Sequence, residues 1–215
     1  MRYSMTSLPR MAALLNALKY LHTYDLRGDI VECGVWQGGS MILAAKTLMA
    51  CGDTDRHLYL YDTFSGMPPP SEHDRHGEQT AESMLSQTPE KTGVWCYAAL
   101  DDVRDNILAT GYPPDKLHFI KGKVEDTIPS TMPDNIALLR LDTDWYASTK
   151  HELEHLYPRL IPKGVLIIDD YGYWDGARKA VDAFLAASNT PHYLHRIDTT
   201  GRLLIKPLAG ASPSN

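Results

Sequence analysis

The chain has 215 residues, of which 43% are hydrophobic, and this composition suits one large α/β domain with a full core. A formal net charge of -6 and a pI near 5.8 argue against nucleic-acid binding, which requires a basic surface. No apolar run approaches the roughly 18 residues of a membrane span, and three cysteines without metal-ligand spacing predict a reduced cytoplasmic protein.

An amphipathic helix is predicted over residues 8–24, where leucines recur at helical spacing. Pro9 suits the first turn of this helix, because its missing N–H would be unpaired there in any case. The N-terminal region 1–27 either covers the core or acts as a flap over a substrate, and core cover is the favoured interpretation.

The next segment predicts a strand, a glycine-rich turn and a helix from about Ser40 to Cys51. Its spacing is Glu32-x-Gly34-x-x-x-Gly38-x-Ser40, which matches neither the dinucleotide fingerprint nor the nucleoside-triphosphate loop. Glycines let a ligand approach the backbone closely, and the helix start offers unpaired N–H groups. The segment therefore indicates a binding site, with a tight packing turn as the alternative.

A second strand over 57–61 ends at Asp62, where an acidic side chain can accept both hydroxyls of a ribose. The Pro- and His-rich stretch 67–77 opens a lid-like insertion over 67–97 that is expected to be largely irregular. A metal site at His73 and His76 is disfavoured, because the flanks are expected to be flexible and no other clear partner is seen.

Two further helices are expected over 80–87 and 98–108, before a third strand over 117–120. Gly122, Glu125 and Asp126 follow this strand and could edge the base of a bound nucleoside. Asp126 and Thr127 could equally cap a helical turn.

The central feature is a buried strand over 136–141 that runs into Asp142 and Asp144. A neighbouring strand over 165–168 ends at Asp169 and Asp170. Ligands bind at the carboxyl ends of strands in open α/β sheets, and oxygen ligands suit Mg²⁺. Consecutive strand residues face opposite ways, so the backbone must turn for both Asp169 and Asp170 to reach one ion. The alternative is that Asp170 caps the following helix.

The remaining elements complete a mostly parallel sheet with helices on both faces and an antiparallel edge. Helices are expected over 148–157 and 175–187, and a hairpin joins 193–197 to 202–206. His151 and His155 on the first helix do not favour a zinc site. The whole chain is predicted to form one domain, with a disordered tail over 209–215.

Four segments together resemble the macrocin O-methyltransferase (TylF/MycF) family of class I S-adenosylmethionine methyltransferases. They are Val31-Glu-Cys-Gly-Val-Trp-Gln-Gly-Gly-Ser40, Tyr61-Asp-Thr-Phe-Ser-Gly-Met-Pro68, Leu139-Arg-Leu-Asp-Thr-Asp-Trp-Tyr-Ala-Ser-Thr149 and Leu156-Tyr-Pro-Arg-Leu with Gly164-Val-Leu-Ile-Ile-Asp-Asp-Tyr-Gly172. The order and spacing of the four segments make the resemblance specific. Thr143 and Trp145 depart from the family pattern, which leaves the acceptor open but not the donor.

The resemblance implies a Rossmann-like seven-stranded sheet, S-adenosylmethionine as the methyl donor and Mg²⁺ as a cofactor. It assigns the metal to Asp142, Asp169 and Asp170, with Asp142 also a candidate general base. The donor-binding residues that it implies are Glu32, Gly34, Val35, Gly38, Ser40, Asp62, Thr63, Gly122, Glu125 and Asp126.

The expected reaction is methylation of a sugar hydroxyl on a glycosylated natural product, a small-molecule acceptor. Mg²⁺ held next to the acceptor oxygens would stabilise the developing alkoxide, and Asp142 would take the proton. A catechol or small phenolic acceptor is the first alternative, since it also offers two adjacent hydroxyls. A non-catalytic donor-binding subunit is the second, and a nicotinamide oxidoreductase is disfavoured. A homodimer is compatible with the sequence.

Overall fold

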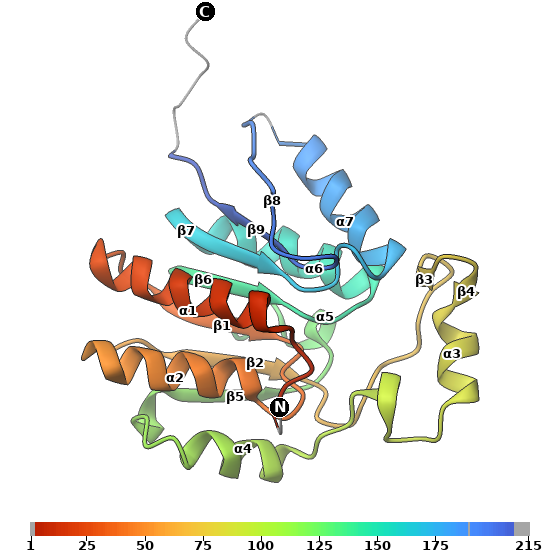
Figure 1. Cartoon of the computed structure of the whole chain (residues 1–215), viewed down its shortest axis with the longest axis horizontal. Coiled ribbons are helices and arrows are strands. Elements are labelled where there is room, and N and C mark those ends of the chain that lie inside the picture. The colour runs from red at the N-terminus through yellow and green to blue at the C-terminus, as the bar shows by residue number, and fades with distance from the viewer. Residues whose placement is uncertain (1–2, 189, 209–215) are drawn as a thin grey trace, which may run out of the picture.

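One sheet with the strand order β5-β2-β1-β6-β7-β9-β8 forms the centre of the computed structural model, which describes residues 3–188 and 190–208 (Figure 1). Its strands are β1 (Asp29–Cys33), β2 (Leu58–Asp62), β5 (Leu117–Lys121), β6 (Ile136–Leu141), β7 (Leu160–Ile168), β8 (His195–Arg196) and β9 (Arg202–Ile205). The first five pair in parallel, whereas β9 runs antiparallel to β7 and to β8. The predicted mostly parallel sheet with an antiparallel edge hairpin is confirmed.

Helices cover both faces of this sheet (Figure 1). The helices are α1 (Leu8–Thr23), α2 (Gly39–Cys51), α3 (Ala81–Gln87), α4 (Leu100–Leu108), α5 (Val124–Thr127), α6 (Tyr146–Leu156) and α7 (Asp175–Ala186). One core lies between the sheet and α1, α2 and α4, and a second lies between the sheet and α5, α6 and α7. Because β6 is covered on both sides, all six of its residues are buried, including Arg140.

Helix α1 begins after Ser7, whose side chain accepts a hydrogen bond from the N–H of Arg10. Leu14, Leu18 and Leu21 lie on one face of the helix and are buried in the first core. The helix itself therefore covers the core, and the flap role of the N-terminal region 1–27 stays a prediction.

The insertion over 67–97 lies beyond the carboxyl ends of the parallel strands (Figure 1). It is less irregular than predicted, because β3 (Arg75–His76) and β4 (Gln79–Thr80) form an antiparallel ladder before α3. Two-residue strands are too short for a period-2 hydrophobic pattern to reveal them. A small core containing Trp145 and Trp174 joins this insertion to the main domain.

Asp74 anchors the insertion to the start of α6. Its buried carboxylate accepts the N–H of Tyr146 through Oδ1 at 2.7 Å, and its Oδ2 accepts from the hydroxyl of Ser71 at 2.7 Å. A side-chain oxygen that accepts an N–H of the first helical turn stabilises the helix end. This distant cap explains why α6 begins at Tyr146, earlier than the predicted Ser148.

Residues 3–188 and 190–208 contain no helix that is both long and apolar enough to cross a bilayer. The tail 209–215, which was predicted to be disordered, lies outside the described residues.

Candidate active site

The register of the central strands places charged residues side by side on one face of the sheet. Glu32 on β1 is directly paired with Arg140 on β6. Because side chains alternate along a strand, Asp142 follows on the same face as Arg140. This is the face that α1 covers, since Ile30 and Leu138, each two residues earlier, pack in the core beneath α1.

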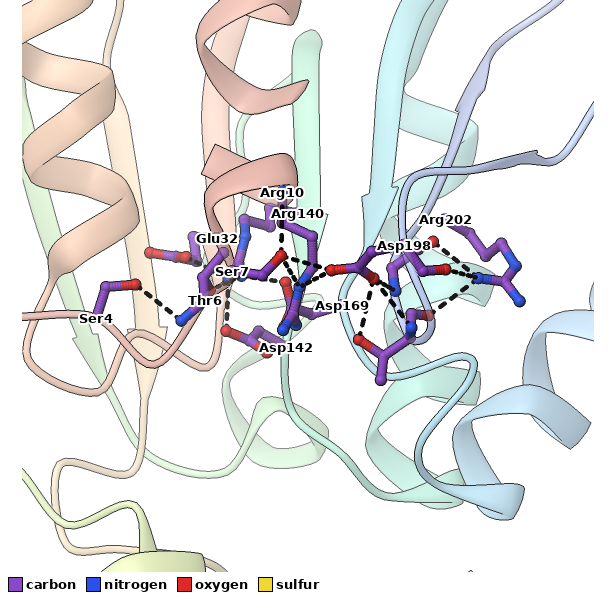
Figure 2. Close-up of polar contacts among 12 residues, drawn as sticks. Ser4, Thr6, Ser7, Arg10, Glu32, Arg140, Asp142, Asp169, Asp198 and Arg202 are labelled. Carbon is purple, nitrogen blue, oxygen red and sulfur yellow. Dashed lines mark hydrogen bonds and ion pairs between the residues drawn. The ribbon is translucent and has the colours of Figure 1, made fainter. Parts of the chain in front are cut away.

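Arg140 lies at the centre of a buried polar network (Figure 2). Its Nη1 donates to Oε1 of Glu32 at 2.7 Å and to Oδ2 of Asp142 at 2.5 Å. Its Nη2 donates to the hydroxyl of Thr6 at 2.8 Å and to Oδ1 of Asp169. Burial would lower the pKa of this guanidinium, but the surrounding carboxylates outweigh burial and hold the pKa well above its ordinary value.

Three carboxylates converge beside this network. One oxygen each from Asp142, Asp144 and Asp170 lies within 4.8 Å of the others. Burial raises the pKa of Asp142 to about 6 and that of Asp144 to about 7, and burial together with nearby like charges raises the pKa of Asp170. Oδ2 of Asp170 is buried and has no hydrogen-bond partner among the described residues. An all-oxygen set with an orphaned buried oxygen fits a hard divalent cation such as Mg²⁺.

Asp169 is the predicted metal ligand that the structure does not bring into this group. Its carboxylate instead accepts hydrogen bonds from both Arg10 and Arg140. The chain turns after β7, so Asp169 points to the arginines while Asp170 points to Asp142 and Asp144. The role of Asp144 was not resolved from the sequence, although its spacing two residues after Asp142 was a signal that the two could meet.

Two adjoining cavities open at the carboxylates, and both are lined by Asp142 and Asp144. The first cavity is also lined by five of the predicted donor residues, Gly34, Asp62, Thr63, Gly122 and Glu125. The second cavity is lined by Val35, Ser40, Asp169 and Asp170, together with aromatic side chains. Gly38, Asp126 and Glu32 line neither cavity: Gly38 is the N-cap of α2, Asp126 lies in α5, and Glu32 is buried beside Arg140.

Asp62 holds the glycine-rich turn in shape. Its Oδ2 accepts the N–H groups of Val35 and Trp36 at 2.7 and 3.0 Å, and its Oδ1 accepts that of Phe64 at 2.7 Å. Nothing in the spacing of the sequence indicated the bonds to Val35 and Trp36, because they join the ends of β1 and β2 across the sheet, whereas the bond to Phe64 is local. Asp62 thus shapes the first cavity as well as lining it.

The histidines considered as metal ligands have other contacts. His76 Nδ1 lies 2.8 Å from the carbonyl oxygen of Tyr173, and the ring of His73 packs edge-on against Tyr146. His151 Nε2 lies 2.9 Å from the carbonyl oxygen of Ile128. Each of these three rings therefore contacts another segment of the chain.

Gly34→Ala is expected to destabilise the protein by more than about 2 kcal/mol, because the new methyl group meets main chain that cannot move aside. A Cβ at Gly34 would lie 2.0 Å from the carbonyl oxygen of Asp142, and the backbone there has φ +81°. Gly52 is a matched control, with φ +71° and no atom within 4 Å of its Cβ position. Gly52→Ala should cost only about 1 kcal/mol of backbone strain, as measured by urea unfolding. Equal losses in the two variants would contradict the steric argument.

Asp198, in the turn between β8 and β9, is expected to stabilise the fold only above acidic pH. Burial would raise its pKa, but hydrogen bonds from Ser7, Gly201 and Thr200 and the charge of Arg10 outweigh burial and lower the pKa to about 2. Because the pKa is lower in the folded state, Asp198 stabilises the fold fully at pH values above its unfolded-state pKa of 3.8. This stabilisation is lost as the pH falls through the folded-state pKa.

Asp198→Asn should therefore cost about 1 kcal/mol at pH 7, after allowance for solvent screening, and the cost should shrink between about pH 4 and pH 2. Thermal unfolding across this pH range measures the difference. Asp134→Asn is the control, because Asp134 forms an exposed pair with Arg159 that should contribute little at any pH. A pH-independent cost for Asp198→Asn would contradict the assignment.

The chain is similar to a known family over nearly its whole length. The family model described as macrocin O-methyltransferase (TylF) matches residues 1–206. The 8-demethyl-8-(2,3-dimethoxy-alpha-L-rhamnosyl)-tetracenomycin-C 4'-O-methyltransferase of Streptomyces olivaceus is 36% identical, over 93% of this chain and 74% of the relative. Mycinamicin III 3''-O-methyltransferase of Micromonospora griseorubida is 34% identical, over 79% of this chain and 65% of the relative.

A solved structure has the same arrangement of elements. The O-methyltransferase NovP superposes with a TM-score of 0.84 at 28% identity, over 96% of this chain and 83% of that chain. Fold, motif order and the family match agree with one another. The chain belongs to the macrocin O-methyltransferase family and is an O-methyltransferase.

Proposed function

We propose that this protein transfers the methyl group of S-adenosylmethionine to a hydroxyl of a sugar on a glycosylated natural product, with Mg²⁺ bound at the carboxylates. The observation that carries the proposal is the convergence of Asp142, Asp144 and Asp170 at the junction of the two cavities. The names of the relatives, one a rhamnosyl-tetracenomycin and one a mycinamicin methyltransferase, support a sugar-bearing acceptor.

The first cavity would hold the donor. Its wall contains the turn at Gly34, the end of β2 at Asp62 and the residues after β5 at Gly122 and Glu125, which suits an extended nucleoside. When bound, the sulfonium of the donor supplies an activated methyl group. The task of the chain is then to orient the donor, and the rigid turn held by Asp62 serves this purpose.

Asp142, Asp144 and Asp170 would hold Mg²⁺, which supplies electrostatic stabilisation for a developing alkoxide. Asp169 would act indirectly in this arrangement. Through its contacts to Arg10 and Arg140 it fixes the end of β7, from which Asp170 projects. This assignment replaces Asp169 with Asp144 in the ligand set expected from the sequence.

The proton acceptor is proposed among the same carboxylates. Asp142 was the candidate from the sequence, but its Oδ2 accepts a charge-assisted hydrogen bond from Arg140. Asp144 has no guanidinium partner among the described residues, which favours it as a second candidate. A base must lie within about 3 Å of the reacting hydroxyl, and both carboxylates line the two cavities.

The second cavity would receive the acceptor. Trp36, Tyr173 and Trp174 contribute to its wall, and their flat apolar faces suit a sugar ring. The same wall would accept a catechol, so both acceptor classes belong in one screen. The homodimer and the cytoplasmic location stay predictions.

The test begins with calorimetric titration of S-adenosylhomocysteine into the purified protein. Binding at one site per chain is the expected result, and no binding at high ligand concentration would overturn the proposal. Glycosylated natural products and catechols are then screened with labelled S-adenosylmethionine. Methylation of a sugar-bearing acceptor supports the proposed substrate class, whereas methylation of catechols alone would replace it.

A further inference from the structure

Arg140 joins the proposed donor side of the site to the proposed cation side through a single nitrogen atom (Figure 2). Nη1 donates to Glu32, which lies in β1 two residues before Gly34 of the glycine-rich turn, and to Asp142, which belongs to the three-carboxylate group. Arg140 and Glu32 are both 2% exposed, so water does not screen this contact strongly.

We propose that Arg140 is a positioning residue that couples donor binding at the glycine-rich turn, which begins directly after the strand of Glu32, to cation binding at Asp142. This inference rests on the proposed function, because it requires that both ligands bind at this site. It assigns Arg140 a role beyond fold stability.

Fold stability alone does not account for a charged side chain at this position. A buried ion pair is costly to desolvate, and apolar residues of similar size are often as stabilising in its place. The rest of β6 is apolar, and its neighbours Leu139 and Leu141 are fully packed in the second core. A guanidinium here has a use if it holds several carboxylates in fixed relative positions, which its planar fork allows.

The orientation of Glu32 depends on Arg140. Oε1 of Glu32 accepts from Nη1, whereas Oε2 is buried and has no hydrogen-bond partner among the described residues. Because Nη1 is shared, any change at Oδ2 of Asp142 alters the strength of the bond to Glu32. A cation that takes Asp142 would therefore change the donor side, and by thermodynamic linkage the donor would change cation affinity equally.

Calorimetry can measure this coupling as the ratio of the S-adenosylhomocysteine dissociation constants without and with saturating Mg²⁺. In the natural protein we expect a ratio that differs from one by about fivefold or more, in either direction. Arg140→Lys keeps the charge, but an ammonium has no planar fork to span three carboxylates. In Arg140→Lys the ratio of the two dissociation constants should therefore lie within about twofold of one.

Arg56→Lys is the matched control, because Arg56 is also buried and also ion-paired, to Asp53 at 2.8 Å. Its Nη1 donates to the carbonyl oxygens of Leu26 and Gly28, and it lines neither cavity. Arg56→Lys should keep the ratio of the natural protein even if it lowers the melting temperature. This control separates loss of coupling from general loss of stability.

The outcomes distinguish the two proposals. Failure of the natural protein to bind S-adenosylhomocysteine would overturn the proposed function. Binding with a ratio near one, or an unchanged ratio in Arg140→Lys, would overturn the coupling and leave the proposed function intact. If circular dichroism shows that Arg140→Lys does not fold, Glu32→Gln decides by the same criterion, since it keeps the side-chain shape and replaces the carboxyl group that Arg140 binds with an amide.

Discussion

Asp142→Asn is expected to lower turnover by about 10³-fold while leaving the S-adenosylhomocysteine dissociation constant, measured without Mg²⁺, within about threefold of its original value. The amide keeps the shape of the side chain but removes the negative charge that it contributes to the three-carboxylate group. The variant would bind the cation more weakly and would no longer accept the proton. Most of the donor cavity is lined by other residues, so donor binding should change little. Initial rates and calorimetry on the same preparation measure the two effects.

Asp53→Asn is the control for loss of a buried, ion-paired carboxylate. Asp53 is 8% exposed and pairs with Arg56, but it lines neither cavity. It should keep normal turnover per folded molecule. Near-normal turnover in Asp142→Asn, or an equal loss in Asp53→Asn, would count against the assignment. Asp144→Asn extends the series, because loss of turnover with unchanged Mg²⁺ affinity would identify Asp144 as the proton acceptor and remove it from the proposed ligand set.

Chelation with EDTA is expected to reduce methyl transfer to about one hundredth or less, and added Mg²⁺ should restore it. The buried, unpartnered Oδ2 of Asp170 and the like charges around it are the physical reason, since a cation would relieve both. A cation that binds the folded state also raises the melting temperature. Mg²⁺ should therefore raise the melting temperature of the natural protein and have little effect on Asp170→Asn.

Full activity in a thoroughly chelated preparation would rule out the metal role. An equal rise of the melting temperature in Asp170→Asn would show that Mg²⁺ stabilises the protein elsewhere. Asp175→Asn provides the charge-matched control, because Asp175 lies nearby in the first turn of α7 but outside the three-carboxylate group.

The fold and the location of the candidate site could be predicted from the sequence because they depend on local patterns. The apolar run of β6 and the leucine spacing of α1 reflect burial on two faces and on one face, respectively. Parallel strands end at the same edge of the sheet, so Asp142 and Asp170 could be expected to meet there without knowledge of the structure. The ladder of β3 and β4 could not be predicted, because two-residue strands are too short to show an alternating hydrophobic pattern.

Only the tertiary structure decided which carboxylates face one another and what holds them. Asp169 and Asp170 are adjacent in the sequence, yet the turn after β7 sends one to the arginines and the other to Asp142 and Asp144. A charged residue in the middle of an apolar strand was a signal that the sequence offered, but its partners depend on register. The pairing of β1 with β6 brings Glu32 beside Arg140 across more than a hundred residues of chain, and no local pattern encodes that contact.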